Sequence, residues 1–285
     1  MKNKLHLLLI GLTTLTISCN TNYQKISKLD MEMTNKEKAV AVIESIGNGN
    51  EEPIAYINAE NYTQHNLAIG DGLEGFGAVM ANAPEGGFKS EVIRAFQDDD
   101  YVFLHVKYDF FGPKAAFDVF RFENGKIVEH WDNLTETTPP NPSGHTQFDG
   151  STAIKDRDLT EANKALVKNF IQDVLMEGKA DKITEYINSE KYIQHNPQIA
   201  DGLEGLGNAL TYFAENDLKL EYNKIHKVLG EGNFVLTMSE GIFGSGDQVA
   251  YYDLWRVEDG KIVEHWDVIQ IIPANSEWKN DNGKF

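Results

Sequence analysis

The sequence predicts an α+β fold that is written twice, as two tandem domains of about three helices packed on a curved, mostly antiparallel sheet. The fourteen-residue segment that begins at Tyr62 recurs from Tyr192 with ten identical positions, and the octapeptide 125–132 recurs unchanged as 260–267. Repeats of this kind indicate duplicated structural units. Within each copy, helical patterns precede strand patterns, an order typical of α+β rather than of alternating βαβ domains.

The first element of each copy is an amphipathic helix. Thr34 and Glu37 fit the capping-box pattern, in which a hydroxyl and a carboxylate bind the free amide groups at a helix start, and Gly47 follows as an end signal. The counterpart begins at Thr160 and ends before Gly178. Apolar residues recur at helical spacing between these limits. We expect shorter second helices at about 53–58 and 181–188, and third helices that start near Leu73 and Leu203.

Strands follow the helices. Segments rich in β-branched and aromatic residues, separated by turn-forming pairs, predict strands at 90–96, 101–110, 116–122 and 126–134, and matching segments occur in the second copy. Short turns between consecutive strands favour antiparallel pairing. The proline-rich stretch 137–144 marks the boundary between the copies. We therefore expect domains at 34–137 and 158–275, a linker at 138–157 and a polar C-terminal tail at 276–285.

The beginning of the chain has the pattern of an export signal. Lys2 and Lys4 precede an apolar run that ends just before Cys19, the only cysteine. This arrangement resembles the lipobox of bacterial lipoproteins, which implies a signal peptide at 1–19, acylation of Cys19 and a tether at 20–33 that holds the protein to a membrane of the cell envelope, in the periplasm or at the outer membrane. The alternative is an ordinary secretory signal that is cleaved near Ser18.

Composition excludes several classes of function. A formal net charge of −18 argues against nucleic acid as a partner, because phosphate binding depends on Lys and Arg. Cys19 is not available as a catalytic thiol if it carries lipid, and no serine lies in a nucleophile-elbow motif. Closely spaced histidine or cysteine pairs are also missing from the sequence, so we expect no metal.

Both copies resemble SnoaL-like domains, a group within the NTF2-like superfamily that includes polyketide cyclases. The matching motifs are Tyr-x-Gln-His-Asn, Asp-Gly-Leu-Glu-Gly, Asp-x-Phe/Trp-Arg and Gly-Lys-Ile-Val-Glu-His-Trp-Asp. The resemblance implies an NTF2-like cone, in which helices close a bent sheet around a ligand pocket, and it implies activity without a cofactor. It says less about the reaction, because the same fold hosts cyclases, isomerases, hydrolases and binding modules.

A carboxylate among aromatic residues is the first candidate for chemistry. By strand alternation Asp118 shares a face with Phe120, and Asp253 shares a face with Trp255. Burial would raise the pKa of such a carboxyl group toward the range of a general acid or base. The alternative is a carboxylate at the pocket rim that binds a backbone amide or an arginine.

The repeated octapeptide contains the second candidate. His130 and Asp132 share one face of a strand, and Trp131 lies on the other, so one of these faces must look inward. The resemblance implies that a histidine or aspartate on the late strands moves a proton, which selects His130 and Asp132 and, in the second copy, His265 and Asp267. The alternative is a solvent-exposed histidine–aspartate pair with Trp131 in the core.

Three further histidines are candidates for stabilising an enolate oxygen. His65 and His195 belong to the repeated Gln-His-Asn, where the alternative is a structural role in binding the loop backbone. His105 lies in the predicted strand 101–110, and counting from Gly112 and Gly244 places Thr237 opposite it, so the copies diverge there. The residues expected to contact a ligand are Tyr62, Gln64, Phe120, Trp131, Tyr192, Gln194, Trp255 and Trp266.

Two functions are compatible with these residues. The first is an acid–base enzyme for a small, mostly apolar carbonyl compound, catalysing aldol condensation, cyclisation or isomerisation, in which Asp118 or His130 takes a proton from the carbon next to the carbonyl. The second is a non-catalytic ligand-binding or assembly lipoprotein. In either case we expect an intramolecular pseudo-dimer, because each sheet would otherwise leave its outer face uncovered.

Overall fold

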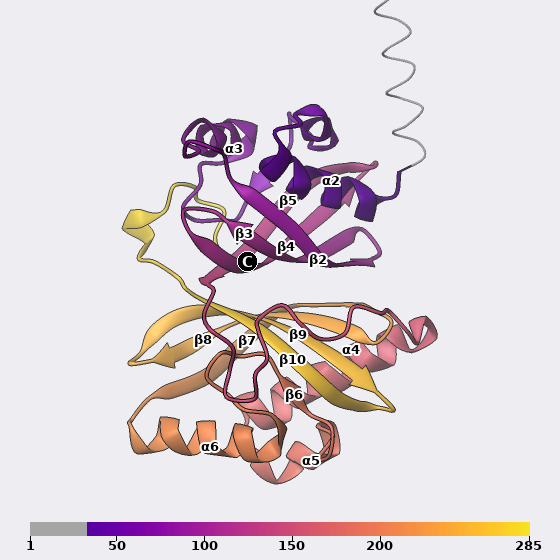
Figure 1. Ribbon diagram of the computed structural model, residues 1–285, viewed down its shortest axis with the longest axis vertical. Coiled ribbons are helices and arrows are strands. Elements are labelled where there is room, and N and C mark those ends of the chain that lie inside the picture. The colour runs from indigo at the N-terminus through magenta and orange to yellow at the C-terminus, as the bar shows by residue number, and fades with distance from the viewer. Residues whose placement is uncertain (1–32) are drawn as a thin grey trace, which may run out of the picture. The chain divides into compact units, whose positions relative to one another are not determined.

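Two five-stranded sheets organise residues 35–285, which form one compact unit (Figure 1). The computed structural model describes residues 33–285, so the predicted signal peptide, almost all of the tether and the acylation site Cys19 lie outside the described residues. Among the residues described, no helix is long and apolar enough to cross a membrane.

The first half of the unit contains one sheet and its helices. The strand order is β1-β5-β4-β3-β2, with antiparallel pairing except between β1 and β5. The elements are α2 (Asn35–Asn48), the 3-10 helix η1 (Glu52–Tyr56), β1 (Thr63–Gln64), α3 (Gly72–Ala81), β2 (Lys89–Asp98), β3 (Tyr101–Asp109), β4 (Pro113–Glu123) and β5 (Lys126–Glu136).

The second half repeats this order, with the sheet β6-β10-β9-β8-β7. Its first helix continues into π-helical turns. The elements are η2 (Arg157–Leu159), α4 (Thr160–Phe170), the π-helical η3 (Ile171–Met176), η4 (Ala180–Lys182), α5 (Ile183–Tyr186), β6 (Ile193–Gln194), α6 (Gly202–Glu215), β7 (Lys219–Glu231), β8 (Phe234–Gly244), β9 (Asp247–Glu258), β10 (Lys261–Ile271) and η5 (Asn275–Glu277).

The predicted α+β class with two tandem copies is confirmed, and the structure adds one short strand to each copy. β1 and β6 come from the Tyr-x-Gln-His-Asn motifs and pair in parallel with β5 and β10. Two residues are too few for a strand periodicity to be visible in a sequence. This pairing matters for the site, because it sets Gln64 opposite His130 and Gln194 opposite His265.

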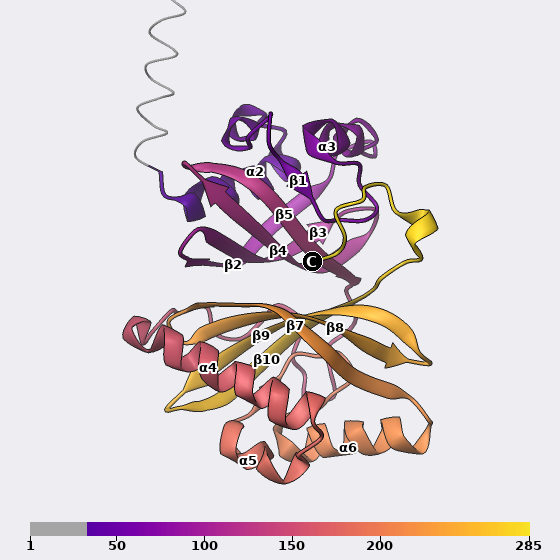
Figure 2. The same ribbon diagram turned by 180° about the vertical axis from the view of Figure 1, so that it is seen from behind.

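Both faces of each sheet are buried. One face packs against helices, α2 and α3 in the first half and α4 to α6 in the second (Figure 2). The other faces form a shared core that contains Phe103 and Trp131 from the first sheet and Leu236 and Trp266 from the second. The long strands therefore carry apolar side chains on both sides, one set for the helices and one for the opposite sheet.

The segments that follow the last strand of each half cross to the other half. After β10, the side-chain amide of Asn280 donates to the backbone carbonyls of Asn66 (2.8 Å) and Ile69 (2.9 Å). After β5, the amide of Asn141 donates in the same way to the carbonyls of Gln194 (2.7 Å) and Ile199 (3.0 Å). The predicted linker and tail thus bind the loops that carry the Gln-His-Asn motifs.

Candidate functional site

A cavity of about 220 Å³ lies between the first sheet and its helices. Its wall is largely aliphatic and aromatic, with side chains such as Ile43, Phe76 and Phe120. The polar residues that line it are Tyr62, Gln64, Asn66, Tyr108, Asp118, His130, Asp132 and Gln270. A few polar groups in an apolar wall are typical of a small-molecule site.

A chain of hydrogen bonds fixes the central histidine. His130 Nε2 lies 3.0 Å from Asp118 Oδ1, and His130 Nδ1 lies 3.2 Å from Gln64 Nε2. The hydroxyl of Tyr108 donates to the other carboxylate oxygen of Asp118 at 3.1 Å. Neighbouring strands bring these groups together, because Asp118 on β4 pairs with Asp132 on β5, two residues from His130 on the same face. Both oxygens of Asp118 are thereby engaged.

Burial and neighbouring charges set the protonation states. Burial raises the pKa of Asp118, while the hydrogen bond and the charge of His130 oppose that rise. Burial also raises the pKa of Tyr62, with further contributions from the carboxylates of Asp132 and Asp118, so this phenol keeps its proton. Tyr62 accepts a hydrogen bond from Gln64 Nε2 at 3.2 Å, which leaves its own O–H available as a donor.

Asp132 has spare hydrogen-bonding capacity. Its Oδ2 accepts a hydrogen bond from Asn66 Nδ2 at 2.7 Å. Its Oδ1 is buried and has no hydrogen-bond partner within the described part of the chain. Asp132 is 6% exposed and lines the cavity. A buried carboxylate oxygen without a partner is costly, and a ligand or a water molecule in the cavity would relieve that cost.

The second half repeats this cluster. His265 Nε2 lies 3.0 Å from Asp253 Oδ1, and His265 Nδ1 lies 3.1 Å from Gln194 Oε1. The amide of Asn196 donates to Asp267 Oδ2 at 2.6 Å. Burial is the largest influence on Asp267 and raises its pKa, and the carboxylate of Asp253 adds to the rise.

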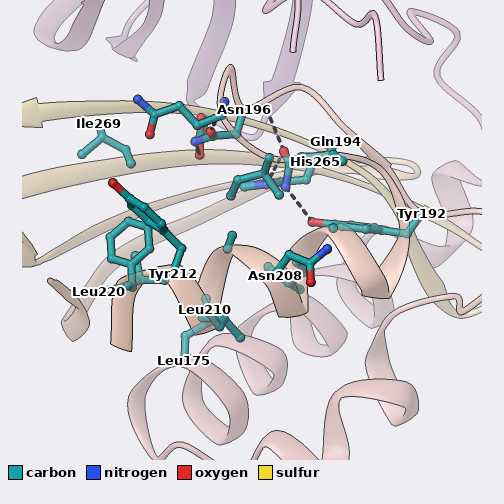
Figure 3. A pocket seen from close by; sticks show the side chains of 18 of the residues that line it. Leu175, Tyr192, Gln194, Asn196, Asn208, Leu210, Tyr212, Leu220, His265 and Ile269 are labelled. Atoms are coloured by element: carbon teal, nitrogen blue, oxygen red, sulfur yellow. Dashed lines mark hydrogen bonds between the residues drawn. The ribbon is translucent and has the colours of Figure 1, made fainter. Parts of the chain in front are cut away.

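The cavity of the second half is larger, about 630 Å³. Figure 3 shows His265 and Gln194 at its polar side and Leu210, Tyr212 and Leu220 along its apolar side. α6 has 14 residues, whereas its counterpart α3 has 10, so the helical wall of the second cavity is longer.

His65 and His195 lie outside the cavities, so the expectation that His65 stabilises an enolate there is wrong. His65 Nδ1 lies 2.8 Å from the Gly283 carbonyl and Nε2 lies 2.9 Å from Glu129 Oε1. Its ring stacks on Trp131 at 4.7 Å. His195 makes equivalent contacts with the Thr146 carbonyl, Glu264 and Trp266. Both histidines tie the crossing segment to the sheet, as the structural alternative proposed.

His105 also lies away from the cavity, on the face that meets the second sheet. Its Nδ1 accepts a hydrogen bond from Arg94 at 3.0 Å. Burial first and the Arg94 charge second hold the pKa of His105 well below its usual value, so the ring is neutral. Successive side chains along a strand point to opposite faces of the sheet, so His105 shares the inter-sheet side with Phe103, two residues before it.

The predicted correspondence between His105 and Thr237 is wrong by one residue. Leu104 pairs with Asp118, and Thr237 pairs with Asp253, so Thr237 corresponds to Leu104 and Met238 to His105. The turns between these strands differ in length, which invalidates counting from the glycines. Thr237 faces the helices, where its hydroxyl accepts a hydrogen bond from Trp255 Nε1 at 3.1 Å.

Six of the eight predicted ligand contacts line a cavity. They are Tyr62, Gln64 and Phe120 in the first half and Tyr192, Gln194 and Trp255 in the second. Trp131 and Trp266 instead belong to the core between the sheets, because they alternate along the strand with the residues that face the cavity.

Other residues of the two sites were not predicted from the sequence. Asn66 and Asn196 directly follow the candidate histidines of the repeated motif, and that repetition could have identified them. Tyr108 on β3 and Tyr222 on β7 bind Asp118 and Asp253 from different places in their copies, so no repeat marks them. Gln270 and Pro142 reach the cavities from the opposite half of the chain.

Each cluster also has the composition of a metal site. Ligand atoms of Asp118, His130 and Asp132 lie within 4.8 Å of one another, as do those of Asp253, His265 and Asp267. Both ring nitrogens of His130 already lie within hydrogen-bond distance of protein groups. A metal ion would have to displace one of these bonds.

Comparison with known proteins identifies the family. The profile of the SnoaL-like domain matches residues 39–130 and 167–265, more than half of the chain. The chain therefore belongs to the SnoaL-like family and contains two tandem copies of its domain. A search of curated proteins finds no match.

Several solved structures resemble parts of the chain. TsrD from Streptomyces laurentii is 24% identical, with 38% of this chain and 89% of that chain covered and a TM-score of 0.29. An NTF2-like protein of unknown function from Cytophaga hutchinsonii is 20% identical, with 36% and 91% covered and a TM-score of 0.32. An LEH-like epoxide hydrolase from M. tuberculosis is 18% identical, with 39% and 84% covered and a TM-score of 0.32.

Proposed function

We propose that this SnoaL-like protein is an acid–base enzyme that acts without a cofactor on a small, mostly apolar carbonyl compound, by aldol condensation, cyclisation or isomerisation. The observation that carries the proposal is the buried oxygen Oδ1 of Asp132, which has no hydrogen-bond partner among the described residues and lies in a mostly apolar cavity beside the hydrogen-bonded pair of Asp118 and His130. The same cluster recurs in the second half.

The groups of the cluster divide the reaction between them. Asp132 Oδ1 takes a proton from the carbon next to the carbonyl, the C–H electron pair forms the enolate double bond, and the carbonyl π electrons move onto oxygen. Tyr62 donates its O–H to that oxygen. In condensation or cyclisation, the enolate carbon attacks a second carbonyl carbon, the π electrons of that carbonyl move onto its oxygen, and the resulting alkoxide takes the proton from Asp132. In isomerisation, a different carbon of the conjugated enolate takes that proton. Either course returns Asp132 to its carboxylate form. Asp118 holds the His130 ring in place, because both of its oxygens are already engaged.

The two cavities select ligands of different size. The first, of about 220 Å³, takes compact ketones or aldehydes, whereas the second, of about 630 Å³, takes bulkier ones. A wall that is mostly apolar favours substrates whose only polar group is the reacting carbonyl.

Two further proposals concern the whole protein. The shared core of Phe103, Trp131, Leu236 and Trp266 supports an intramolecular pseudo-dimer. The pattern that ends at Cys19 supports a lipid anchor in the cell envelope, in the periplasm or at the outer membrane. Mass spectrometry of the membrane fraction tests the anchor, and an unmodified, soluble mature chain would exclude it.

Deuterium exchange tests the enzyme proposal without knowledge of the substrate. The protein is incubated in D₂O with cyclohexanone and 2-tetralone, and NMR follows loss of the signals of the protons next to the carbonyl. We expect exchange that the double variant Asp132→Asn, Asp267→Asn slows by at least about 100-fold. The control His105→Met installs the residue that the second half has at the corresponding position. Exchange that is equal in the double variant and the wild type would contradict the proposal.

A non-catalytic ligand-binding protein is the second candidate, and the size of the apolar second cavity favours it. This function predicts that 2-tetralone binds to the wild type and to Asp267→Asn with similar affinity, measured by calorimetry, and that neither protein accelerates exchange.

A further inference from the structure

The segment that follows β10 lies along the loop that carries the first cluster. Asn282 donates its amide to the Gln64 carbonyl (3.0 Å) and to Asp71 Oδ1 (2.8 Å). The Gly283 carbonyl lies 2.8 Å from His65 Nδ1. These bonds hold the residue that comes next, Lys284, against the first half.

Lys284 is a buried cation beside this cluster. Its side chain is enclosed in the protein, and the residue is 7% exposed. Its ammonium group donates to the backbone carbonyl of Asp132 at 2.6 Å and to Gln270 Oε1 at 2.8 Å. Gln270 lines the first cavity. Lys284 therefore connects the main chain at Asp132 to a cavity-lining side chain from the other half.

Among residues 33–285, no buried lysine lies beside the second cluster. The segment after β5 binds its loop through Asn141 and Thr146, much as the segment after β10 binds the first loop. Both segments contain the pattern Asn-x-x-Gly, which is followed by Lys284 in one case and by His145 in the other. The nitrogens of His145 lie 2.8 Å from Asp149 and 3.2 Å from Asp201, so this side chain binds other carboxylates.

We propose that Lys284 is a positioning residue of the first site, which fixes the main chain of Asp132 and the side chain of Gln270 and holds a positive charge beside the Asp118–His130–Asp132 cluster. The proposal rests on the proposed function for the role of that cluster. The ammonium group interacts electrostatically with the side chain of Asp132, the group that accepts the proton in the proposed reaction. The second site works without this cation, so the two sites differ in their dependence on pH.

The surroundings define when the charge is present. Burial lowers the pKa of Lys284 from 10.5 to about 8, and the nearby Asp132 carboxylate opposes that change. The ammonium form therefore predominates at neutral pH and is lost as the pH rises above about 8. The other titratable groups that face the cluster are Tyr62, Tyr108 and Tyr252, whose raised pKa values keep them neutral over this range.

The first test measures the coupling and needs no turnover. NMR of lysine side chains gives the pKa of Lys284 in the wild type, in Asp132→Asn and in the matched control Asp267→Asn, which changes the second cluster. We expect a value near 8 in the wild type, a fall of at least about 0.5 unit in Asp132→Asn and no change in the control. The proposal would be overturned if the pKa of Lys284 were the same in Asp132→Asn as in the wild type, or if Asp267→Asn changed it by the same amount.

The second test uses deuterium exchange in an Asp267→Asn background, where the first site acts alone. Lys284→Gln keeps hydrogen-bond donors and removes the charge. In the background protein we expect the exchange rate to fall above pH 8, as Lys284 loses its proton. Lys284→Gln should lower the exchange rate at pH 7 by about 10-fold and should not show that fall, whereas Lys284→Arg should retain most of the rate. Lys279→Gln, an exposed lysine of the same segment, is the control and should behave as the background protein. If that background protein shows no exchange, the proposed function fails while the coupling result still decides the role of Lys284. A Lys284→Gln profile like that of the background would refute it.

Discussion

The two halves place the same aspartate, histidine, glutamine and asparagine side chains together, but the surroundings of the two clusters differ. His130 and His265 each lie 3.0 Å from the carboxylate of an aspartate on the neighbouring strand. The first cluster lines a cavity of about 220 Å³ and lies beside a buried lysine. The second lines a cavity of about 630 Å³ and has no buried lysine beside it among the described residues. Divergence after duplication has thus affected the cavity walls and the crossing segments more than the clusters.

The core between the sheets shows a second difference. Arg94 and Lys227 occupy corresponding strand positions, and each places its cation over a tryptophan of the other half, at 4.3 Å and 4.2 Å. Arg94 also donates to the carbonyls of Phe148, Asp149 and Ser151. An arginine thus holds the first crossing segment, and the corresponding lysine has a smaller role.

The largest effect expected from this comparison is on stability. Arg94→Met removes a buried guanidinium and leaves three partly buried carbonyls without this donor, so we expect a loss of about 3 to 5 kcal/mol in the free energy of unfolding. Lys227→Met, the matched variant, removes a cation–π contact and should cost about 1 kcal/mol. Urea unfolding measures both. Equal losses would show that the crossing segment contributes nothing through Arg94.

The second-largest expected effect concerns which of the two sites acts on which substrate. We expect Asp132→Asn to slow proton exchange of cyclohexanone by about 100-fold and to leave exchange of 2-tetralone nearly unaffected, because this variant removes the base of the first site only. Asp267→Asn should give the reverse pattern. NMR in D₂O measures both rates. If either variant slowed both compounds equally, the two cavities would not select by size.

The first half has a titratable residue, His105, where the second half has Met238, and this difference should make stability depend on pH. The pKa of His105 is lowered well below 6.5 in the folded protein. As the pH falls through 6.5, His105 therefore becomes protonated in the unfolded chain but stays neutral in the folded chain. His105 therefore does not reduce the free energy of unfolding above about pH 6.5, and it reduces that free energy increasingly as the pH falls below this value. His105→Met should remove about 1 kcal/mol of this dependence between pH 7 and 5.5. Urea unfolding at both pH values checks the difference, and an unchanged slope would contradict it.

The smallest effect concerns the cavity wall. Phe76 lines the first cavity, and Leu206, at the corresponding place in the repeated motif, lines the second. Phe76→Leu enlarges the first cavity and should raise exchange of 2-tetralone by about 3-fold in an Asp267→Asn background. Leu206→Phe in an Asp132→Asn background is the reciprocal variant and should lower it. Unchanged rates in both would locate the size limit elsewhere.

Strand alternation predicted much of the site. It placed Asp118 with Phe120 and His130 with Asp132, and in the structure these four residues share the cavity. It could not decide whether Trp131 or His130 is the inward residue, because it assumed one buried face. Both faces are buried, one by helices and one by the second sheet, so each residue has its own interior.

The crossing segments were beyond prediction from the sequence. The residues 276–285 are polar and have no periodic pattern, yet Asn280, Asn282 and Lys284 bind the first half. Lys284 and Asp132 are separated by 152 positions, and no local rule connects them.

The repeated motifs were sufficient to establish two α+β copies, the order of their elements and the aspartate and histidine of each cluster, because repeats, periodicity and turn signals are local properties of a chain. Packing of the two sheets against each other determined that Trp131 and His105 belong to a core and that His65 and His195 bind crossing segments. These outcomes depend on which distant surfaces bury each other, and that depends on the free energy of the whole folded chain rather than on any segment of it.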